Sequence, residues 1–458
     1  MLSSTIPGTS LGTLTDLYQL TMAGAYFREG RNERATFEMF VREMPPRRGY
    51  LISAGLEDAV YYLTRVGFGK PEIAYLRSLG RFDPGFLAML RGFRFTGDLD
   101  AMPEGTVFFP QEPILRVTAP RIQGQLVETF LLNTVNFQIL AATKAARAVE
   151  AAAGRSVVDF SLRRTHGGDA GLKVARASWL AGFQGTSNVM AGQRFGIPVV
   201  GTVAHSFIMS YLTEREAFAA LARTHPKGAV FLLDTYDVDR ALGEAIRVAR
   251  AHAPTGFEFL GVRLDSGDLG TQARRIRARL DAEGFPRAQI LASGNLDEYS
   301  IRKLVRAGAP IDTFAVGTAL GTSNDSPALG VNYKLVADEG GGGPRFTMKL
   351  SARKRTWPGA KQVWRFRRGR MFVRDVMGLT REGSHGGTPL LAPVMRAGRL
   401  LRPLPSLAAA RRRCAAQLAR LPARYRRLES PPCFPVTASA ELRAEVRNIL
   451  RLLGKGGP

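Results

Sequence analysis

The chain has 458 residues, of which 45% are hydrophobic and 22% are charged, and these are the proportions of a globular protein. Its 26 phenylalanines supply core-forming side chains, which argues against general disorder. The two cysteines are too few for a disulfide framework or a four-thiolate zinc site. No apolar run approaches the ~18 residues of a membrane-spanning helix, and no basic stretch followed by an apolar one opens the chain. We therefore expect a cytoplasmic protein without a secretory signal or a membrane anchor.

The chain carries 64 Lys and Arg against 39 Asp and Glu, a formal net charge of +25. Such a charge is typical of nucleic-acid binding, or of a positive field that attracts small anions. The densest basic stretch, Arg411 to Arg427, reads as an amphipathic helix with Leu418 and Leu421 between its charges and contains no series of stacking aromatics. We favour small anions over nucleic acid and keep the nucleic-acid alternative open.

The first ~125 residues show an α+β pattern. A helix is expected from Thr15 to Ala25, capped by Thr15 or Asp16, and residues 35–41 alternate like a half-buried strand. Two further strands are expected around 107–109 and 114–117, and a long helix without Pro or Gly covers about 125–153.

After Gly154, short apolar runs alternate with amphipathic helices. The runs lie at 157–158, 199–200, 230–233, 259–262, 290–291 and 314–316. The helices are expected at 214–222, 239–251, 270–282 and 297–307. This alternation predicts βα units and a parallel sheet, either a barrel or a doubly wound sheet.

Polar residues follow each apolar run at once. The successive strand ends are DFSLRR from Asp159, GTVAH from Gly201, Asp234, RLDSGD from Arg263, SGN from Ser293 and GT from Gly317. The carboxyl ends of parallel strands converge on one edge of a sheet, where such proteins hold their active sites. The sequence therefore predicts an enzyme with its site at this edge.

The residues at this predicted edge suit an anionic, phosphorylated-sugar ligand. Guanidinium and ammonium groups pair with carboxylates and phosphates, turns without a Cβ expose N–H groups to phosphate, and carboxylates bind ribose hydroxyls or a Mg²⁺–phosphate unit. The candidates are Arg163, Arg164, Arg263 and Lys349 as cations, Gly294 and Gly317 as turns, and Asp234 and Asp265 as carboxylates.

His205 is the main candidate nucleophile, because a neutral imidazole is competent to attack a γ-phosphoryl group. Neither a Walker A motif nor a G-x-G-x-x-G after a strand is present, which argues against a P-loop ATPase and a dehydrogenase. No His, Cys and Glu spacing points to zinc.

At these residues the sequence resembles the nicotinate phosphoribosyltransferase family. The matching stretches include TDLYQLTMAGAYF from Thr15, DFSLRRTHG from Asp159, GTVAHSF from Gly201, VRLDSGDL from Val262 and ASGNLDEY from Ala292. They occur in family order over nearly the whole chain.

The resemblance implies an irregular (β/α) barrel of the type II phosphoribosyltransferase kind. Residues 125–335 would form this barrel, beside an N-terminal α+β domain (1–124) on which a C-terminal segment (336–458) packs. The implied reaction joins nicotinate to 5-phosphoribosyl 1-diphosphate, yields nicotinate mononucleotide and diphosphate, and opens NAD salvage. ATP hydrolysis would be coupled through a phosphohistidine at His205, with Mg²⁺ as cofactor and unknown metal ligands.

The resemblance also implies roles for single residues. Phe160 stacks on one face of the pyridine ring, and Tyr18, supplied by the second subunit of a homodimer with shared active sites, stacks on the other. Arg263 and Thr202 contact nicotinate, with Arg163 near the base or diphosphate, and Asp265 lies by the ribose. The 5-phosphate is assigned to Gly294, Asn295, Gly317 and Thr318, and a phosphate-rich C-terminal stretch holds Lys349, Ser351 and Lys361.

Ser187 bears on the choice of base. Related nicotinamide phosphoribosyltransferases carry Asp at this position, and an aspartate there accepts from an amide NH₂ but repels a carboxylate. Ser187 therefore favours nicotinate, with nicotinamide as the alternative substrate. The alternative of a different class is a basic nucleic-acid-binding protein on a former enzyme scaffold.

Overall fold

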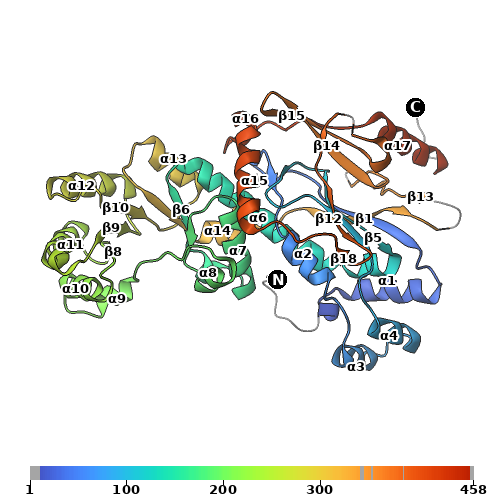
Figure 1. Ribbon diagram of the computed structural model, residues 1–458, viewed down its shortest axis with the longest axis horizontal. Helices are drawn as coiled ribbons and strands as arrows, with labels where there is room; N and C mark the ends of the chain where they lie inside the picture. Colours follow the sequence, from blue (N-terminus) through green and yellow to red (C-terminus); the bar gives the residue numbers. More distant parts are fainter. Residues whose placement is uncertain (1–10, 341–344, 352–353, 385, 454–458) are drawn as a thin grey trace. The chain divides into compact units, whose positions relative to one another are not determined.

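The computed structural model describes residues 11–340, 345–351, 354–384 and 386–453 (Figure 1). The opening residues, on which the expectation of no secretory signal rests, lie outside these ranges. The chain forms two compact units, a mixed unit (Met1–Thr143 with Ala328–Pro458) and a parallel-sheet unit (Lys144–Pro327). The boundaries predicted from the sequence lie near 124 and 335. The first division falls inside one continuous helix, α6 (Glu128–Ala152), which has no Pro or Gly to interrupt it.

The mixed unit is built on a seven-stranded antiparallel sheet. Its order is β13 (Arg345–Phe346), β12 (Val331–Asp338), β1 (Arg34–Val41), β5 (Pro113–Pro120), β3 (Asp98–Ala101), β17 (Ala392–Arg396) and β18 (Arg399–Leu400). The prediction that β1 is half-buried is wrong, because every residue after Arg34 is buried. Helix α5 (Arg121–Leu126) packs against β1, and the buried Glu38 pairs with Lys361 from the C-terminal segment. Both faces of the strand are therefore covered.

Two smaller sheets and several helices complete the mixed unit. The four-stranded sheet has the order β16 (Thr388–Pro389), β14 (Lys361–Arg368), β15 (Met371–Leu379) and β19 (Val436–Ala438), and β2 (Leu51–Ile52) pairs with β4 (Val107–Phe108). The helices are α1 (Leu17–Arg28), α2 (Leu56–Leu63), α3 (Lys70–Ser78), α4 (Pro84–Arg91), α15 (Leu407–Arg420), α16 (Ala423–Arg426) and α17 (Ala440–Leu452). The expected first helix and the strands near 107 and 114 are confirmed. The basic stretch Arg411 to Arg427 is only partly one helix, because α15 ends at Arg420 and Pro422 separates it from α16.

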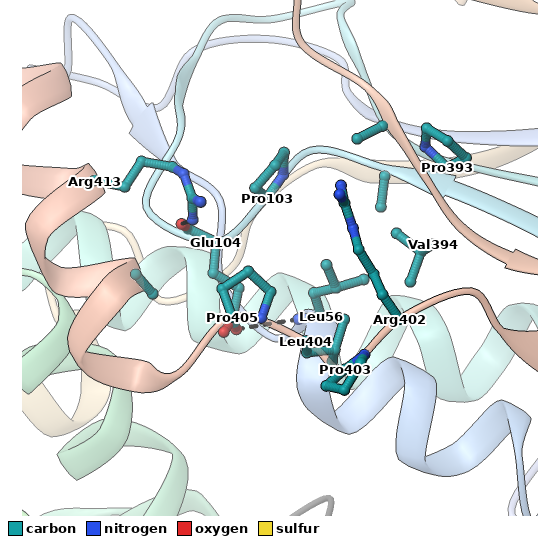
Figure 2. Close-up of a pocket in the computed structure, with 13 residues that line it drawn as sticks. Leu56, Pro103, Glu104, Pro393, Val394, Arg402, Pro403, Leu404, Pro405 and Arg413 are labelled. Atoms are coloured by element: carbon teal, nitrogen blue, oxygen red, sulfur yellow. Dashed lines mark hydrogen bonds between the residues drawn. The ribbon is translucent and has the colours of Figure 1, made fainter.

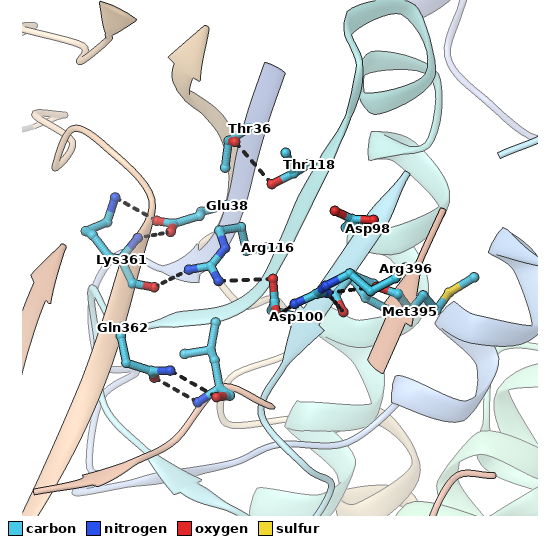
Figure 3. A network of polar contacts seen from close by, with 12 residues as sticks. Thr36, Glu38, Asp98, Asp100, Arg116, Thr118, Lys361, Gln362, Met395 and Arg396 are labelled. Carbon is cyan, nitrogen blue, oxygen red and sulfur yellow. Dashed lines mark hydrogen bonds and ion pairs between the residues drawn. The ribbon is translucent and has the colours of Figure 1, made fainter. Parts of the chain in front are cut away.

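A buried polar network joins β14 to the seven-stranded sheet (Figure 3). Lys361 Nζ lies 2.6 Å from Glu38 Oε2 and donates to the carbonyls of Trp357 and Gly359. Arg116 donates to the Lys361 carbonyl at 2.6 Å and pairs with Asp100 at 3.0 Å. The Lys361 ammonium is therefore used inside the fold, which corrects its assignment to a phosphate-binding stretch.

The parallel-sheet unit has six strands, and every neighbouring pair is parallel. Their order is β7 (Gly185–Thr186), β6 (Ser156–Asp159), β11 (Thr313–Val316), β10 (Gln289–Ala292), β9 (Phe259–Leu264) and β8 (Ala229–Leu232). The helices are α7 (Gly168–Leu180), α8 (Val189–Phe195), α9 (His205–Met209), α10 (Glu214–Thr224), α11 (Val238–His252), α12 (Leu269–Ala282), α13 (Glu298–Arg306) and α14 (Thr318–Thr322). The predicted βα alternation and irregular α/β barrel are confirmed.

One predicted strand, Val199–Val200, is wrong. Val199 forms only an isolated bridge to Thr186, and β7 takes the edge of the sheet instead. The apolar pair lies between Pro198, which has no N–H to donate, and Gly201, so too few residues remain to extend a ladder.

Within the described residues, no helix combines the length and apolarity needed to cross a membrane.

Candidate active site

The carboxyl end of the parallel sheet gathers the polar residues that the sequence placed at strand ends. Arg263 is the second-to-last residue of β9, Asp265 directly follows this strand, and Asp234 follows β8. The neighbouring strands end at Phe160 after β6 and at Ser293 after β10. Because adjacent parallel strands run in register, these side chains share one edge.

Arg263 is the centre of this edge. It is 7% exposed, and its guanidinium donates to Ser293 Oγ (2.8 Å), Thr202 Oγ1 (2.9 Å) and the Val203 carbonyl (3.2 Å). It also forms an ion pair of 2.7 Å with Asp265 Oδ1. Four of its five N–H groups are therefore engaged, and one Nη2 hydrogen remains for a ligand.

The Arg263 guanidinium also packs over an aromatic ring. Its carbon lies 5.5 Å from the centroid of the Phe160 ring, which is 6% exposed. This cation–π contact fixes the cation and the ring as one surface. A flat aromatic acid that stacks on such a ring places its carboxylate next to a positive charge.

Asp265 is held as a carboxylate. Burial opposes its ionisation, but hydrogen bonds from Ser293 (2.5 Å) and Arg263, with the charges of Arg263 and His205, outweigh burial and lower its pKa. The site therefore contains a fixed negative charge at neutral pH beside a fixed positive one.

His205 begins the short helix α9 and is half-buried. Its Nδ1 lies 3.1 Å from Thr235 Oγ1, and its Nε2 lies 3.8 Å from Asp265 Oδ2. Nδ1 is thus within hydrogen-bond distance of the Thr235 hydroxyl, whereas Nε2 faces the Asp265 carboxylate beyond hydrogen-bond distance. The sequence singled out His205 and Asp265 but missed Thr235, although it directly follows Asp234.

Asp234 braces the loop after β9. Its Oδ2 accepts from the Asp265 backbone N–H at 3.0 Å and from the Ser266 hydroxyl at 2.5 Å. Its Oδ1 is buried and has no hydrogen-bond partner among the described protein atoms. A buried, unpaired carboxylate oxygen is an available acceptor for a ligand hydroxyl or a cation.

Asp159 supports the turn that carries Phe160. It is fully buried, accepts from the Ser161 N–H (2.8 Å) and from Thr186 Oγ1 (2.7 Å), and burial raises its pKa despite these bonds. The Ser187 N–H donates to the Asp159 carbonyl at 2.8 Å, so the half-buried Ser187 is placed by the same turn. Thr186 is a supporting residue that the sequence did not single out.

Two glycine turns form concave backbone at the same edge. Gly294 has φ of +88°, and a Cβ there would lie 1.8 Å from the Asp265 carbonyl oxygen. Asn295 is also left-handed at φ +51°, which is unusual for a residue with a side chain. Gly317 caps the N-terminus of α14, which Thr318 begins. Such backbone presents N–H groups to anionic oxygens.

Three other predicted site residues, Arg163, Tyr18 and Lys349, take part in none of the hydrogen bonds and ion pairs given above. Arg163 lies exposed in the short 3₁₀ turn Leu162–Arg164 and has no ion pair within the described ranges. Tyr18 lies on α1 of the mixed unit, 49% exposed, and burial together with the charge of Glu128 raises its pKa. Lys349 is an exposed residue of the mixed unit, and its backbone N–H donates to Thr356 Oγ1.

No group of three or more His, Cys, Asp or Glu side chains in the described part of the chain is arranged to hold a metal ion by itself. Asp234 and Asp265 are the partly exposed carboxylates among the residues described above, whereas Asp159 is fully buried and accepts from Ser161 and Thr186. This donor set fits Mg²⁺, which binds through one or two carboxylates and completes its shell with substrate phosphates and water.

Comparison with known proteins supports one family. The sequence matches the nicotinate phosphoribosyltransferase (NAPRTase) N-terminal domain over residues 13–136, the NAPRTase family over 155–337 and the NAPRTase C-terminal domain over 385–445. It is 45% identical to nicotinate phosphoribosyltransferase pncB2 of Mycobacterium tuberculosis, across 95% of this chain and 93% of that protein. It is 46% identical to the Bacillus subtilis nicotinate phosphoribosyltransferase, across 78% and 73% of the two chains.

Solved structures agree with the sequence comparison. The fold is similar to the crystal structure of human nicotinic acid phosphoribosyltransferase, with a TM-score of 0.85, 32% identity, and coverage of 95% of this chain and 99% of that chain. The nicotinate-nucleotide pyrophosphorylase of Pyrococcus furiosus shares the fold at a TM-score of 0.73 and 22% identity, with 89% and 95% of the chains covered. With three matched family segments and these relatives, the chain belongs to the nicotinate phosphoribosyltransferase family.

Proposed function

We propose that the protein transfers the phosphoribosyl group of 5-phosphoribosyl 1-diphosphate to nicotinate, giving nicotinate mononucleotide and diphosphate. The observation that carries this proposal is the cluster of Arg263, Asp265 and Phe160 at the carboxyl end of the parallel sheet. Relatives that cover most of the chain are named nicotinate phosphoribosyltransferases, which supports the same reaction. This activity would open NAD salvage from nicotinate.

The binding roles follow from charge and shape. Nicotinate stacks on Phe160, and its carboxylate meets the remaining Nη2 hydrogen of Arg263. Thr202, which holds Arg263 Nη1 at 2.9 Å, fixes that hydrogen in place. The ribose hydroxyls bind the Asp265 carboxylate.

Phosphate groups take the backbone and cationic positions. The 5-phosphate binds at the turns of Gly294 and Asn295 and at the N-terminus of α14, where Gly317 and Thr318 lie. Arg163, exposed and without an ion pair in the described ranges, is available to the diphosphate. Lys349, exposed on the mixed unit, is a further phosphate ligand in this proposal.

The transfer needs positioning and charge stabilisation more than proton movement. The pyridine nitrogen lone pair forms the new bond to the anomeric carbon, and the bonding electrons of the C–O bond leave with diphosphate. Positive charge that develops on the ribose in the transition state is stabilised by the Asp265 carboxylate, whose lowered pKa keeps it ionised. When bound, Mg²⁺ would neutralise diphosphate charge, and Asp234 Oδ1 is the protein oxygen available to hold it.

ATP hydrolysis is coupled to the transfer through His205 in this proposal. A ring nitrogen takes the γ-phosphoryl group as the P–O bond to ADP breaks, and water later releases phosphate from the imidazole. Thr235 and Asp265 hold the ring on its two sides. The proposal also includes a homodimer in which Tyr18, half-exposed on α1, stacks on the nicotinate of the second subunit.

Diphosphate release tests the function. It is measured with nicotinate or nicotinamide, 5-phosphoribosyl 1-diphosphate and Mg²⁺, with and without ATP, on the wild type and His205→Ala. We expect turnover with nicotinate, stimulation by ATP, and loss of that stimulation in His205→Ala. Diphosphate release with nicotinamide but not with nicotinate would show that nicotinamide is the substrate. No diphosphate release with either base would refute the proposed reaction and favour a non-catalytic anion-binding protein.

A further inference from the structure

A cavity of about 390 Å³ lies in the mixed unit and belongs to none of the residues assigned to catalysis (Figure 2). Its walls come from the start of α2, the end of β3 and the residues that follow it, β17, and α15 with the segment that leads into it. Ten of its thirteen lining residues are apolar, namely Leu56, Ala101, Pro103, Ala392, Pro393, Val394, Pro403, Leu404, Pro405 and Ala410. A volume of this size accommodates a small organic ligand, and the walls favour a hydrocarbon body.

The remaining three lining residues are charged, and their partners differ. Glu104 is 7% exposed, and its Oε1 accepts from the backbone N–H groups of Gly55 (2.7 Å) and Leu56 (3.2 Å) at the start of α2. Arg413 Nη1 donates to the Glu104 carbonyl oxygen at 2.9 Å. Burial lowers the pKa of Arg413, and the Glu104 charge partly offsets this effect. The two residues thus form a polar side of the cavity that is already hydrogen-bonded.

Arg402 is different, because it is exposed and its guanidinium has no hydrogen bond or ion pair with any residue in the described ranges. Figure 2 shows its side chain extended across the cavity, with the guanidinium between Pro103 and Pro393 in that view. Pro403 and Pro405 follow it and fix their own φ angles, so the segment that carries Arg402 is stiff. The exposed side chain of Arg402 leaves its guanidinium N–H groups open to an anion above the apolar walls.

The charges that line the cavity also favour a particular net charge on the ligand. The two arginines and Glu104 leave one net positive charge in the cavity. A monoanion neutralises it, whereas a dianion would meet the nearby Glu104 carboxylate with excess negative charge. A carboxylate matches the planar fork of a guanidinium in two parallel hydrogen bonds.

We propose that this cavity is a second ligand site, which binds a small apolar monocarboxylate with its carboxylate on Arg402 and its hydrocarbon body against the proline and aliphatic walls. Proline rings offer flat faces on which an aromatic ring packs well. The site is independent of the proposed transfer reaction, since none of its residues takes part in it.

Benzoate is the probe, because it is an aromatic monocarboxylate without a pyridine nitrogen and cannot accept a phosphoribosyl group. Its binding is measured by isothermal titration calorimetry on the wild type, Arg402→Gln and the matched control Arg399→Gln. Arg399 is exposed on β18, three residues away, and lines a different cavity. Both variants remove one surface cation, so a general charge effect lowers both equally.

We expect Arg402→Gln to weaken binding to the cavity by about tenfold or more, the worth of a charge-assisted pair, while Arg399→Gln stays within about twofold. Benzamide, the neutral analogue of the same shape, must bind more weakly than benzoate. Equal weakening by both variants, or equal binding of benzamide and benzoate, would overturn the proposal.

Hydrogen–deuterium exchange separates this cavity from the catalytic edge. With benzoate bound, exchange should slow in residues 392–394 and 402–413. Slowing confined to residues 159–163 and 262–268 would assign all binding to the catalytic edge and refute the second site. Absence of any binding at tens of millimolar benzoate would refute it as well. Ala392→Leu, which fills the cavity and keeps Arg402, must reduce the same protection.

Discussion

Thr235 Oγ1 lies 3.1 Å from His205 Nδ1, so the first residue of α9 is held by the residue after Asp234 at the end of β8. His205 has no other side-chain hydrogen bond of normal length among the described contacts, since Asp265 Oδ2 is 3.8 Å from Nε2. Rotation of the imidazole about its side-chain bonds is therefore restrained mainly by one hydroxyl.

Thr235→Val should lower ATP stimulation without removing the imidazole. Valine keeps the shape of threonine and lacks the hydroxyl, and the lost hydrogen bond is worth about 1 kcal/mol, or about fivefold in rate. Thr235→Ser keeps the hydroxyl and should retain most of the stimulation. The ratio of diphosphate release with and without ATP measures the effect. Equal ratios in the two variants would show that Thr235 does not orient His205.

Gly294→Ala should destabilise the fold, and Gly317→Ala should not. At Gly294 the new Cβ meets the Asp265 carbonyl at 1.8 Å and φ is +88°, so we expect a loss of about 2 kcal/mol or more in unfolding free energy. At Gly317, φ is −110° and the nearest atom, the Phe160 carbonyl oxygen, is 3.3 Å away. That variant should stay within about 1 kcal/mol of the wild type and raise the KM for 5-phosphoribosyl 1-diphosphate.

Urea unfolding and initial rates check this pair of variants. A stable Gly294→Ala protein would show that the loop after β10 relaxes away from Asp265. An unchanged KM in Gly317→Ala would remove Gly317 from the proposed phosphate site.

Ser187→Asp should shift base preference toward nicotinamide. The new carboxylate would lie in a half-buried position next to the Asp159 turn, where it repels the nicotinate carboxylate and accepts from an amide. We expect the ratio of kcat/KM for nicotinate over nicotinamide to fall by about tenfold or more. Ser187→Asn, of the same size without charge, is the control. An unchanged ratio in Ser187→Asp would discard Ser187 as a specificity residue.

Ser293→Ala should move the acid limb of activity to higher pH. The folded pKa of Asp265 is lowered, so its contribution to stability is present above the unfolded pKa and is lost as pH falls through the folded pKa. Removing the Ser293 hydrogen bond raises the folded pKa, and Asp265 then becomes protonated at a higher pH. The pH profile of kcat/KM measures this shift. A profile that superposes on the wild type would show that Ser293 does not tune Asp265.

The polar edge of the parallel sheet could be predicted from the sequence because its signal is local. An apolar run marks a strand, and the polar residue that follows lies at its carboxyl end, as Asp234 after β8 and Asp265 after β9 illustrate. The same reasoning failed at Val199–Val200, where Pro198 and Gly201 limit the ladder to one bridge. The spacing of apolar residues along the chain does not indicate how many backbone N–H groups are free to pair with a neighbouring strand.

Contacts between distant residues were beyond the sequence for a different reason. The four acceptors around Arg263 come from three segments, and their convergence depends on strand register. Lys361 shows the reverse case, since the family resemblance placed it in a phosphate-rich stretch. It is buried instead, because β14 runs beside β5 and brings Lys361 to Glu38.

Lys361→Met should therefore cost stability and not merely charge. Burial lowers the pKa of Lys361, and the charge of Glu38, 2.6 Å from the Lys361 ammonium, opposes this effect. Removing Lys361 leaves the Glu38 side chain buried without its partner, and breaking a buried ion pair in this way lowers the free energy of unfolding by about 3–5 kcal/mol. The double variant Glu38→Gln with Lys361→Met should recover part of that loss.

The exposed pair Arg381–Glu441 gives the control, since Arg381→Met should change unfolding free energy by no more than about 1 kcal/mol. Urea unfolding measures all three. Equal losses at Lys361 and Arg381 would mean that the Lys361–Glu38 pair is no more important to stability than a surface contact.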